Sequence, residues 1–582
     1  MEITSKSEWN TWDEIDWTRI DTQIFKLQKR IYRASTNGDF KLVHKLQKMM
    51  VNSWYAKLLS VRKVSQENKG KKTAGIDGIK SLSPTKRLKL AKTLSINGTS
   101  QPTRRVWIPK PGKKEMRPLG IPTMEDRAKQ ALVKLAIEPE WEAKFEGNSH
   151  GFRPGRSCHD AIKAIKDHIR FKPKYVLDAD IAKCFDGINH EKLLDKLQTF
   201  PMLKRQVKAW LKAGVIDFSK WSERKELSET TAGTPQGGVV SPLLANIALH
   251  GMENILKDYV ENISMKSPGG YHLSKSSKRA TLGVIRYADD FVIIHENLNI
   301  VLKCKEIIEN YLAELDLKLK PSKTRIAHTL MTHLNEKPGF NFLGFHIQQF
   351  PKGKHHSGKN TKKELLGFKT IIEPQKEKIQ IHYRKLDEEI DKMMSCKQTE
   401  LINKLNPIIR GWCNYQSPWN SSKAYRKVSN LIWNRLWRWG KRRHPNKGKK
   451  WIARKYWNPN DDWRFKTRIK ENPLALHKHS DFKCGINWIK VKGNKSPFDG
   501  DETYWSKRMG DMYITQEPQK ARLMKKQKGK CKYCGTNFLP DDLIEKHHVI
   551  KRSNGGNNGD NNLILVHLHC HDKIHHKGES AN

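Results

Sequence analysis

Two adjacent acids stand between two short apolar runs in residues 285–294, and this feature constrains the fold more than any other. A buried strand tolerates an acid only when the acid is paired or binds a metal ion. A β-hairpin with Asp289 and Asp290 at its tip would offer both carboxylates to an ion without burying them. We therefore predict a hairpin here, although two acids after a strand, taken alone, more often form an ordinary turn.

A second strand that ends in acids is predicted over residues 175–181. Side chains of a strand alternate between its faces, so Asp178 and Asp180 share one face. Phosphoryl transfer with two metal ions requires carboxylates from separate strands that converge on the ions. Mg²⁺ suits such a site, because phosphates and water complete its octahedral shell. Asp178 also has a plainer interpretation, which we prefer: a hydrogen-bonded acid at the end of a strand.

The charge of the chain concerns its partners. The 582 residues include 110 Lys and Arg against 61 Asp and Glu, a formal net charge of +49. A protein this positive needs a polyanion, either a nucleic acid or a membrane surface. No window approaches the roughly 18 consecutive apolar residues of a membrane-spanning helix, and the first residues lack the features of a secretory signal or transit peptide. Nine scattered cysteines indicate a reducing compartment. We expect a soluble, intracellular, multidomain nucleic-acid binder.

The hydrophobic pattern divides the chain into four regions. Residues 1–70 follow helical spacing and extend a region that reaches residue 365, in which apolar strands alternate with helices and with Gly or Pro turns. This is an α+β pattern. Residues 366–470 are helical, basic and rich in Trp, residues 471–520 form a linker with a small element, and residues 521–582 concentrate Cys and His.

Two short-spaced pairs of soft ligands mark the C-terminal region: Cys531 with Cys534, and His567 with Cys570. Four such ligands suit tetrahedral Zn²⁺. A domain of about 60 residues has too small a core to be stable without a staple of this kind. A redox pair is the rival interpretation for the first two cysteines. We disfavour it because no thioredoxin-like βαβ pattern surrounds them.

The order of short motifs around the acids resembles that of the reverse transcriptases. Thr-Pro-Gln-Gly-Gly at 234–238 precedes an apolar helical run, and Tyr-Ala-Asp-Asp follows at 287–290. Further matching segments lie at 73–78, 105–110, 117–122, 151–157 and 341–345. Segments 27–31, 38–39 and 411–415 are typical of one branch, the group II intron-encoded proteins. The resemblance covers nearly the whole chain.

This resemblance implies a multidomain α+β fold. Right-hand polymerase fingers and palm would occupy residues 1–365, and a helical thumb would occupy residues 366–470. Asp180, Asp289 and Asp290 would hold two Mg²⁺ ions at the site of nucleotide transfer.

The same resemblance implies contacts with the incoming deoxynucleoside triphosphate (dNTP). Lys110 and Arg117 would contact the triphosphate as a point charge and a fork; a solvated basic surface is the alternative. Phe185 would lie under the sugar and disfavour a 2′-hydroxyl, with an ordinary core position as its alternative. Gln236 would border the nascent base pair, where the two glycines that follow it permit close backbone approach.

Residues 366–470 would also be the maturase domain, or domain X, which the family links to splicing of the intron RNA. Trp433 and Trp437 are four residues apart, so we expect them to pack in a core. The aromatic and basic side chains interleaved around them suit structured RNA or a duplex product. Residues 471–520 would be the DNA-binding region, an assignment made largely from position.

The Cys/His region resembles an HNH, or ββα-metal, endonuclease domain over residues 521–582. By this resemblance, His548 would be the general base that activates water, and Asn562 would orient it. His547 and His571 would bind one catalytic divalent ion, which we expect to be Mg²⁺.

Two departures from the HNH pattern leave the ligand set open. Many relatives have Cys at the position of His567 and Asp at that of His547. Glu545 is a further candidate ligand. The alternative for the whole domain is a zinc module that recognises DNA without cutting it.

The resulting hypothesis is a multifunctional intron mobility protein. It would be an RNA-directed DNA polymerase, an RNA maturase and an HNH endonuclease, with the lariat ribonucleoprotein of a group II intron RNA, double-stranded target DNA and dNTPs as partners and no membrane. We expect the bacterial cytoplasm, with association to the nucleoid during work on DNA; a homodimer stays open. The alternatives are a splicing factor with relic catalytic sites and a reverse transcriptase of the retron or CRISPR-associated kind.

Overall fold

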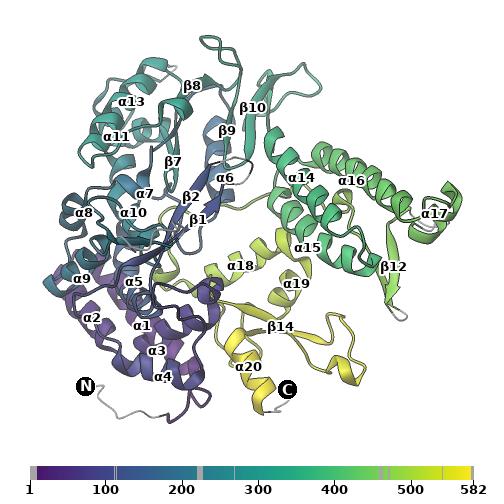
Figure 1. The fold of residues 1–582 in the computed structure, drawn as a ribbon. Coiled ribbons are helices and arrows are strands. Elements are labelled where there is room, and N and C mark those ends of the chain that lie inside the picture. Colours follow the sequence, from purple (N-terminus) through teal and green to yellow (C-terminus); the bar gives the residue numbers. More distant parts are fainter. Residues whose placement is uncertain are drawn as a thin grey trace.

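The computed structural model describes residues 9–110, 112, 115–218, 227–267, 269–457, 463–469, 472–540 and 542–577. The chain begins with a layer of helices (Figure 1). Its elements are α1 (Trp17–Thr36), α2 (Phe40–Asn52), α3 (Trp54–Arg62), η1 (Lys63–Glu67), η2 (Lys69–Lys72) and α4 (Pro84–Thr93). Side chains cap the first three helices: Asp16, Asp39 and Ser53 each accept a hydrogen bond from a backbone N–H in the first turn.

A small sheet and a long buried helix follow. The sheet has the strand order β2-β1-β4-β5, and the elements are β1 (Thr103–Pro109), β2 (Met116–Ile121), β4 (Val215–Asp217), β5 (Leu227–Ser228) and α5 (Met124–Lys144). Strand β1 runs antiparallel to β2 and parallel to β4. Helix α5 is buried over most of its length, because α1, α2 and α3 pack against it.

A four-stranded antiparallel sheet, here called the central sheet, has the order β6-β7-β3-β8. Its strands are β3 (Tyr175–Asp180), β6 (Gly283–Tyr287), β7 (Asp290–His295) and β8 (Arg325–His328). The helices around it are α6 (Cys158–Ile169), α7 (Cys184–Gly187), α8 (His190–Leu197), α9 (Pro201–Leu211), α10 (Ser241–Leu249), α11 (Met252–Asn262), α12 (Lys275–Thr281), α13 (Leu298–Ala313) and η3 (Pro321–Lys323).

Both faces of the central sheet are covered. Phe291 and Ile293 of β7 join the core shared with the N-terminal helices, whereas Val292 and Ile294 join a second core beneath α6. Strands buried on both faces read as continuous apolar runs rather than as alternating ones. This explains why the sequence around the two acids is apolar on either side.

A three-stranded sheet and a helical region come next. The sheet contains β9 (Phe340–Phe342), β10 (Phe345–Pro351) and β11 (Phe368–Pro374). The helical region contains α14 (Lys376–Lys392), α15 (Gln398–Gln416), α16 (Ser422–Arg443), α17 (Lys449–Tyr456), β12 (Lys466–Ile469), β13 (Asn472–Ala475) and η4 (His479–Asp481). It has its own core, in which Trp433 and Trp437 stack with ring centroids 5.5 Å apart, as the spacing predicted.

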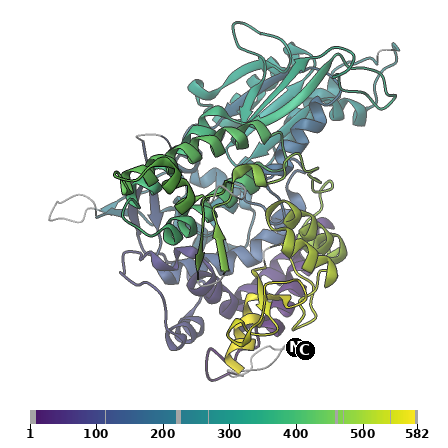
Figure 2. The same cartoon turned by 90° about the vertical axis from the view of Figure 1, so that its right-hand side faces the viewer.

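The C-terminal unit returns to the start of the chain. Its elements are η5 (Pro497–Asp499), α18 (Glu502–Gln516), α19 (Pro518–Lys526), β14 (Ile544–His548), η6 (Arg552–Asn554), β15 (Leu563–His567) and α20 (Leu568–Lys577). Strands β14 and β15 pair antiparallel, and α20 packs on both of them, which is the expected ββα arrangement. Figures 1 and 2 both show this yellow unit beside the purple N-terminal helices.

Candidate active sites and a candidate zinc centre

Three aspartates meet at one edge of the central sheet. Asp180 is the last residue of β3 and Asp290 is the first of β7, and the register sets them directly opposite each other. Asp289 lies in the tight turn between β6 and β7, where its carbonyl oxygen accepts a hydrogen bond from the backbone of Ile181 at 3.3 Å. The hairpin and the strand that the sequence predicted therefore bring their acids together.

The electrostatics of this edge favour a cation. Burial, and then the neighbouring charges of Asp289 and Asp180, raise the pKa of Asp290 to about 7. Burial is also the main cause that raises the pKa of Asp289. Like charges this close cannot all ionise without a counter-charge. Lys323 supplies one, because its Nζ lies 2.6 Å from Asp180 Oδ2. Carboxylates from two strands are a donor set that fits divalent cations.

Asp178 has a different environment. It lies on β3 opposite Arg325 of β8, and the two side chains form an ion pair at 3.4 Å. Burial raises the pKa of Asp178 to about 6, against the opposing effect of Arg325. This pairing agrees with the structural role that we preferred for Asp178.

Residues outside the acids shape the turn. Ala288 has a φ of 59°, and a Cβ placed on Gly151 would lie 2.3 Å from the backbone nitrogen of Ala288. The buried guanidinium of Arg286 donates hydrogen bonds to the Ala288 carbonyl, to Asn246 Oδ1 and to Ser149 Oγ. Gly151 and Arg286 thus fix the position of Asp289. The sequence motifs contain both, but only the fold reveals their role.

The segments that contain Phe185 and Gln236 are joined by a backbone hydrogen bond. The ring of Phe185 meets that of Phe152 edge-on at 6.1 Å, and its carbonyl accepts a hydrogen bond from Thr234. The carbonyl of Gln236 accepts a hydrogen bond from Gly120 of β2 at 2.7 Å. The turn that contains Gln236 therefore joins the small sheet to the segment that follows β3.

Lys110 and Arg117 lie on the β1–β2 hairpin. Lys110 pairs with Glu115 at 2.8 Å. Burial raises the pKa of Asp186, the neighbour of Phe185, against the opposing charges of Arg105, Lys183 and Lys110. Burial likewise raises the pKa of Asp289, and Arg117 is among the cations that oppose the rise. Lys110 therefore lies near Asp186, and Arg117 lies near Asp289. Arg105 of β1 is another cation near Asp186, and we did not single it out from the sequence.

A second site lies at the base of the C-terminal unit. The ligand atoms of Cys531, Cys534, His567 and Cys570 all lie within 4.8 Å of one another. Three thiols and one imidazole at this separation are compatible with tetrahedral zinc. Hydrogen bonds from the neighbouring cysteines hold the pKa of Cys534 far below its usual range, which favours the thiolate that zinc requires.

Three histidines form another cluster on the ββα unit. The ligand atoms of His547, His571 and His575 also lie within 4.8 Å of one another. The Nε2 atoms of His571 and His575 are 3.2 Å apart. The buried Nδ1 of His547 has no hydrogen-bond partner among the described residues. Nitrogens on one tetrahedral ion would be about 3.3 Å apart, so this donor set fits a divalent ion.

The third histidine of this cluster is His575. From the sequence we assigned His547 and His571 to the ion but not His575. Its spacing of four residues from His571 could have indicated that the two side chains lie on the same side of one helix. Glu545, the further candidate ligand, contacts His571 Nδ1 at 2.7 Å.

The side chains of His548 and Asn562 form their hydrogen bonds with other residues. His548 Nε2 is bonded to Asn558 Oδ1 at 2.8 Å. The buried amide of Asn562 instead accepts a hydrogen bond from the Ile550 N–H and donates to the carbonyls of Ile550 and Asn557. That Asn562 orients His548 therefore stays a prediction, in which Asn562 would act through the loop backbone. Asn562 clamps the loop that follows His548, because a buried amide must satisfy its hydrogen bonds and the loop backbone is nearest.

Comparison with known proteins gives four family models in order along the chain. They are the N-terminal domain of reverse transcriptase at residues 12–94, reverse transcriptase (RNA-dependent DNA polymerase) at 108–347, the maturase-specific domain of group II introns at 379–457 and HNH endonuclease at 531–577. The group II intron-encoded protein LtrA of Lactococcus lactis subsp. cremoris is 33% identical over 60% of this chain and 66% of its own length. The chain belongs to the group II intron-encoded proteins.

Other relatives of this group II intron-encoded protein are more distant or shorter. Protein YkfC of Escherichia coli is 30% identical over 56% of this chain and 88% of its own length. Maturase-like protein 1 of Euglena longa is 26% identical over 62% of this chain and 72% of its own length. The matched part spans just under two thirds of the lactococcal protein. No helix among the described residues is long and apolar enough to cross a membrane.

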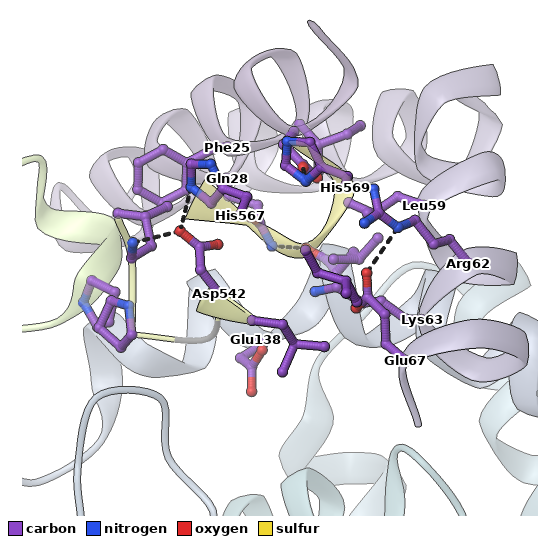
Figure 3. Close-up of a pocket in the computed structure, with 18 of the residues that line it drawn as sticks. Phe25, Gln28, Leu59, Arg62, Lys63, Glu67, Glu138, Asp542, His567 and His569 are labelled. Atoms are coloured by element: carbon purple, nitrogen blue, oxygen red, sulfur yellow. Dashed lines mark hydrogen bonds and ion pairs between the residues drawn. The ribbon is translucent and has the colours of Figure 1, made fainter. Parts of the chain in front are cut away.

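In this intron-encoded protein the HNH unit docks on the first helix. Lys573 of α20 pairs with Asp16 at 3.2 Å, and His569 lies 3.6 Å from Asp21. The ring of His569 stacks on that of the zinc-ligand candidate His567, with centroids 5.0 Å apart. Figure 3 shows the cavity of about 110 Å³ at this seam, with His567 and His569 facing side chains of the N-terminal helices. The orientation of the unit is thus tied to its ligand cluster.

Proposed function

We propose that this protein copies intron RNA into DNA at a nicked target, assists splicing of that RNA, and nicks target DNA with its HNH domain. The observation that carries the proposal is the convergence of Asp180, Asp289 and Asp290 at one sheet edge, in a chain that also contains the three-histidine cluster. A new 3′-hydroxyl made by the nuclease would serve as the primer.

The three aspartates would hold two Mg²⁺ ions. Bound there, the ions would acidify the primer hydroxyl and stabilise the charge that develops on the phosphate. The carboxylates themselves need no movement of the backbone to converge, because the sheet register sets their positions. Lys323, which now pairs with Asp180, would be released by the stronger charge of an ion.

The neighbouring side chains would hold the dNTP. Lys110 and Arg117 would contact the triphosphate, and this role is supported by the proximity of Lys110 to Asp186 and of Arg117 to Asp289. Phe185 would lie under the sugar, in the position that its edge contact with Phe152 fixes. Gln236 would border the nascent base pair, because its turn is pinned between β2 and the segment after β3.

In the HNH domain, His547, His571 and His575 would hold the catalytic divalent ion. His548 would accept a proton from the attacking water, with Asn558 holding its far nitrogen and Asn562 holding its loop. The Cys/His cluster would hold a structural Zn²⁺ ion and so keep α20 in place.

The domain boundaries follow from this assignment. Fingers and palm would occupy residues 1–365, the thumb and maturase domain residues 366–470, the DNA-binding region residues 471–520 and the HNH domain residues 521–582. The helical region with its separate core would bind the intron RNA. All nine cysteines lie outside disulfides, which suits the bacterial cytoplasm, where we place the protein.

Primer extension tests the polymerase. Purified protein with an RNA template, a DNA primer, dNTPs and Mg²⁺ should make cDNA, and Asp289→Asn should reduce the rate by about 1,000-fold or more, because a cation ligand is lost. The same variant should still promote splicing. The reciprocal variant His548→Ala should lose DNA nicking and keep primer extension.

Each variant is the control for the other, since both must fold for either activity to survive. A wild-type protein that promotes splicing but makes no cDNA would favour the alternative of a splicing factor with relic sites. Loss of splicing in a folded Asp289→Asn protein would contradict separable roles. Nicking by His548→Ala would remove His548 from the role of base.

A further inference from the structure

A groove of about 540 Å³ lies between α6 and residues 487–490. Helix α6 contributes Lys163, Lys166 and Arg170, which share one side of the helix because they are three and seven residues apart. Lys490 faces them from the other wall. The two walls come from segments more than 300 residues apart. The groove therefore cannot be recognised from the sequence of either segment.

The cations that line this groove outnumber its acids. Asp167 is the one acid that lines the groove, and it already pairs with Lys163. Among the residues that the structure describes, no carboxylate forms an ion pair with Lys166, Arg170 or Lys490. Lys166 and Lys490 are nevertheless half-buried, and burial lowers the pKa of both amines. The charge of Asp167 opposes this lowering for both amines, but one carboxylate among four cations leaves the groove positive. A polyanion would offset the cost of burying that positive charge.

One buried carboxylate holds the two walls of the groove together. Asp160, at the first turn of α6, is fully buried and accepts hydrogen bonds from the Trp488 indole at 3.2 Å and from the Val491 N–H at 2.9 Å. These two bonds hold the wall that contains Lys490 against the helix. The spacing of the cations is therefore fixed by the fold before any ligand binds.

The same carboxylate ties the groove to the endonuclease. Asp160 also pairs with Arg508 of α18 at 2.7 Å, with both side chains buried. Helix α18 packs on α19, which contacts β15 of the HNH unit. Anything bound in the groove is thus held at a set position relative to the histidine cluster. This connection favours the substrate of the nuclease over the intron RNA.

We propose that the groove between α6 and residues 487–490 binds the phosphodiester backbone of double-stranded target DNA. The proposal rests on the proposed function, and it extends the DNA-binding region beyond residues 471–520 to a helix of the polymerase domain. The contacts are with phosphates, so they add affinity without reading the base sequence.

Binding to a fluorescein-labelled DNA duplex of mixed sequence tests the proposal, with full-length protein and several salt concentrations. The double variant Lys166→Gln/Lys490→Gln should weaken binding about 5- to 10-fold at moderate salt. The slope of log affinity against log salt should fall by nearly 2, at about 0.9 per lost phosphate contact. Lys166→Arg/Lys490→Arg keeps the charges and should restore both values.

The matched control removes the same charge elsewhere. Lys204 pairs with Asp195, and Lys305 pairs with Glu309, both on exposed surfaces. Lys204→Gln/Lys305→Gln should change duplex binding less than about 2-fold. Equal losses in the two double variants would mean that only net charge matters, and an unchanged affinity in the groove variant would show that DNA does not enter. Either result would overturn the proposal.

Two further measurements separate other outcomes. A folded RNA of matched length serves as the competing probe, and a larger loss of RNA binding than of duplex binding would overturn the assignment to DNA. Primer extension on an RNA template should be unchanged in the groove variant. A wild-type protein that extends no primer would contradict the proposed function. A groove variant with normal primer extension and normal duplex binding would contradict only the proposal that the groove binds DNA.

Discussion

The buried carboxylate of Glu146 stabilises residues that position the acid cluster. Its carboxylate accepts a hydrogen bond from the Gly251 N–H at 2.6 Å and contacts His250 Nδ1 at 2.9 Å. Burial alone would raise its pKa, but the hydrogen bond with His250 and the charges of His250 and Arg286 lower the pKa to about 2. Arg286 is also the residue that holds the carbonyl of Ala288. The charge of Glu146 thus stabilises Arg286, which positions the turn of the β6–β7 hairpin.

A pH dependence follows at this residue. A carboxyl whose pKa falls on folding stabilises the protein above its ordinary value of 4.5, and that stability is lost as the pH falls toward 2. Glu146→Gln should therefore lower the free energy of unfolding of this region by about 2–3 kcal/mol at pH 7. The difference should be roughly half as large near pH 3.5. Urea unfolding at both pH values measures it.

Glu125→Gln is the matched control, because Glu125 lies on α5, the helix that ends just before Glu146, and is exposed in its pair with Lys129. It should change the stability by less than about 0.5 kcal/mol at either pH. An effect of Glu146→Gln that does not vary with pH would contradict a role for its charge.

At the scale of elements, the β6–β7 hairpin depends on a segment far from it in the sequence. Residues 148–151 run beside β6, with the His150 N–H donating to the Arg286 carbonyl and the Arg286 N–H donating to the Asn148 carbonyl. Gly151 then passes so close to the turn that no side chain fits. The hairpin itself was predictable from the apolar runs. The packing of residues 148–151 against it was not, because no local sequence pattern indicates a contact between two distant backbone segments.

Gly151→Ala tests whether the close approach of residue 151 to the turn positions Asp289. Its new Cβ would displace the Ala288 backbone and with it Asp289, so primer extension should fall by about 100-fold, as for other displacements near 1 Å at an active site. Gly353→Ala is the control, since a Cβ there meets nothing within 4 Å. It should keep full activity. Both proteins should bind the template RNA normally, and full extension by Gly151→Ala would show that the turn tolerates the shift.

At the scale of the whole molecule, the HNH unit contains a candidate zinc cluster and packs against α1. Helix α20 serves both purposes with different faces: His571 and His575 face the candidate ion site, while His569 and Lys573 face the first helix. The proposed nuclease is thereby joined to the proposed polymerase. The core of the unit is small, so its stability should depend on zinc.

Cys570→Ser tests this dependence. The variant should lose its bound zinc, its nicking activity and its resistance to limited proteolysis at the C-terminal unit, because metal binding supplies folding free energy. Primer extension should stay within about 2-fold of the wild type. Cys396→Ser, at a half-buried thiol outside the cluster, should keep its zinc. Zinc measured by atomic absorption decides the outcome, and a zinc-free variant that still nicks DNA would contradict the staple.

The sequence anticipated most of the sites because their chemistry is local. Asp289 and Asp290 are adjacent, and each pair of zinc-ligand candidates is closely spaced, so the residue types and spacings are visible without a fold. The partner of His548 was missed for the opposite reason. Asn558 lies in an irregular loop, where no periodicity predicts which way a side chain points.

From the sequence we could predict a polyanionic partner, the order of the domains, the acid-bearing hairpin and the Cys/His ligand pairs. Charge, periodicity and short spacings encode these features directly. The tertiary structure alone decided that Gly151 and Arg286 fix the turn, that His575 completes the histidine cluster, that Asp160 joins α6 to residues 488–508, and that α20 docks on α1. These are contacts between distant segments, and their geometry arises only when the cores bury their apolar faces together.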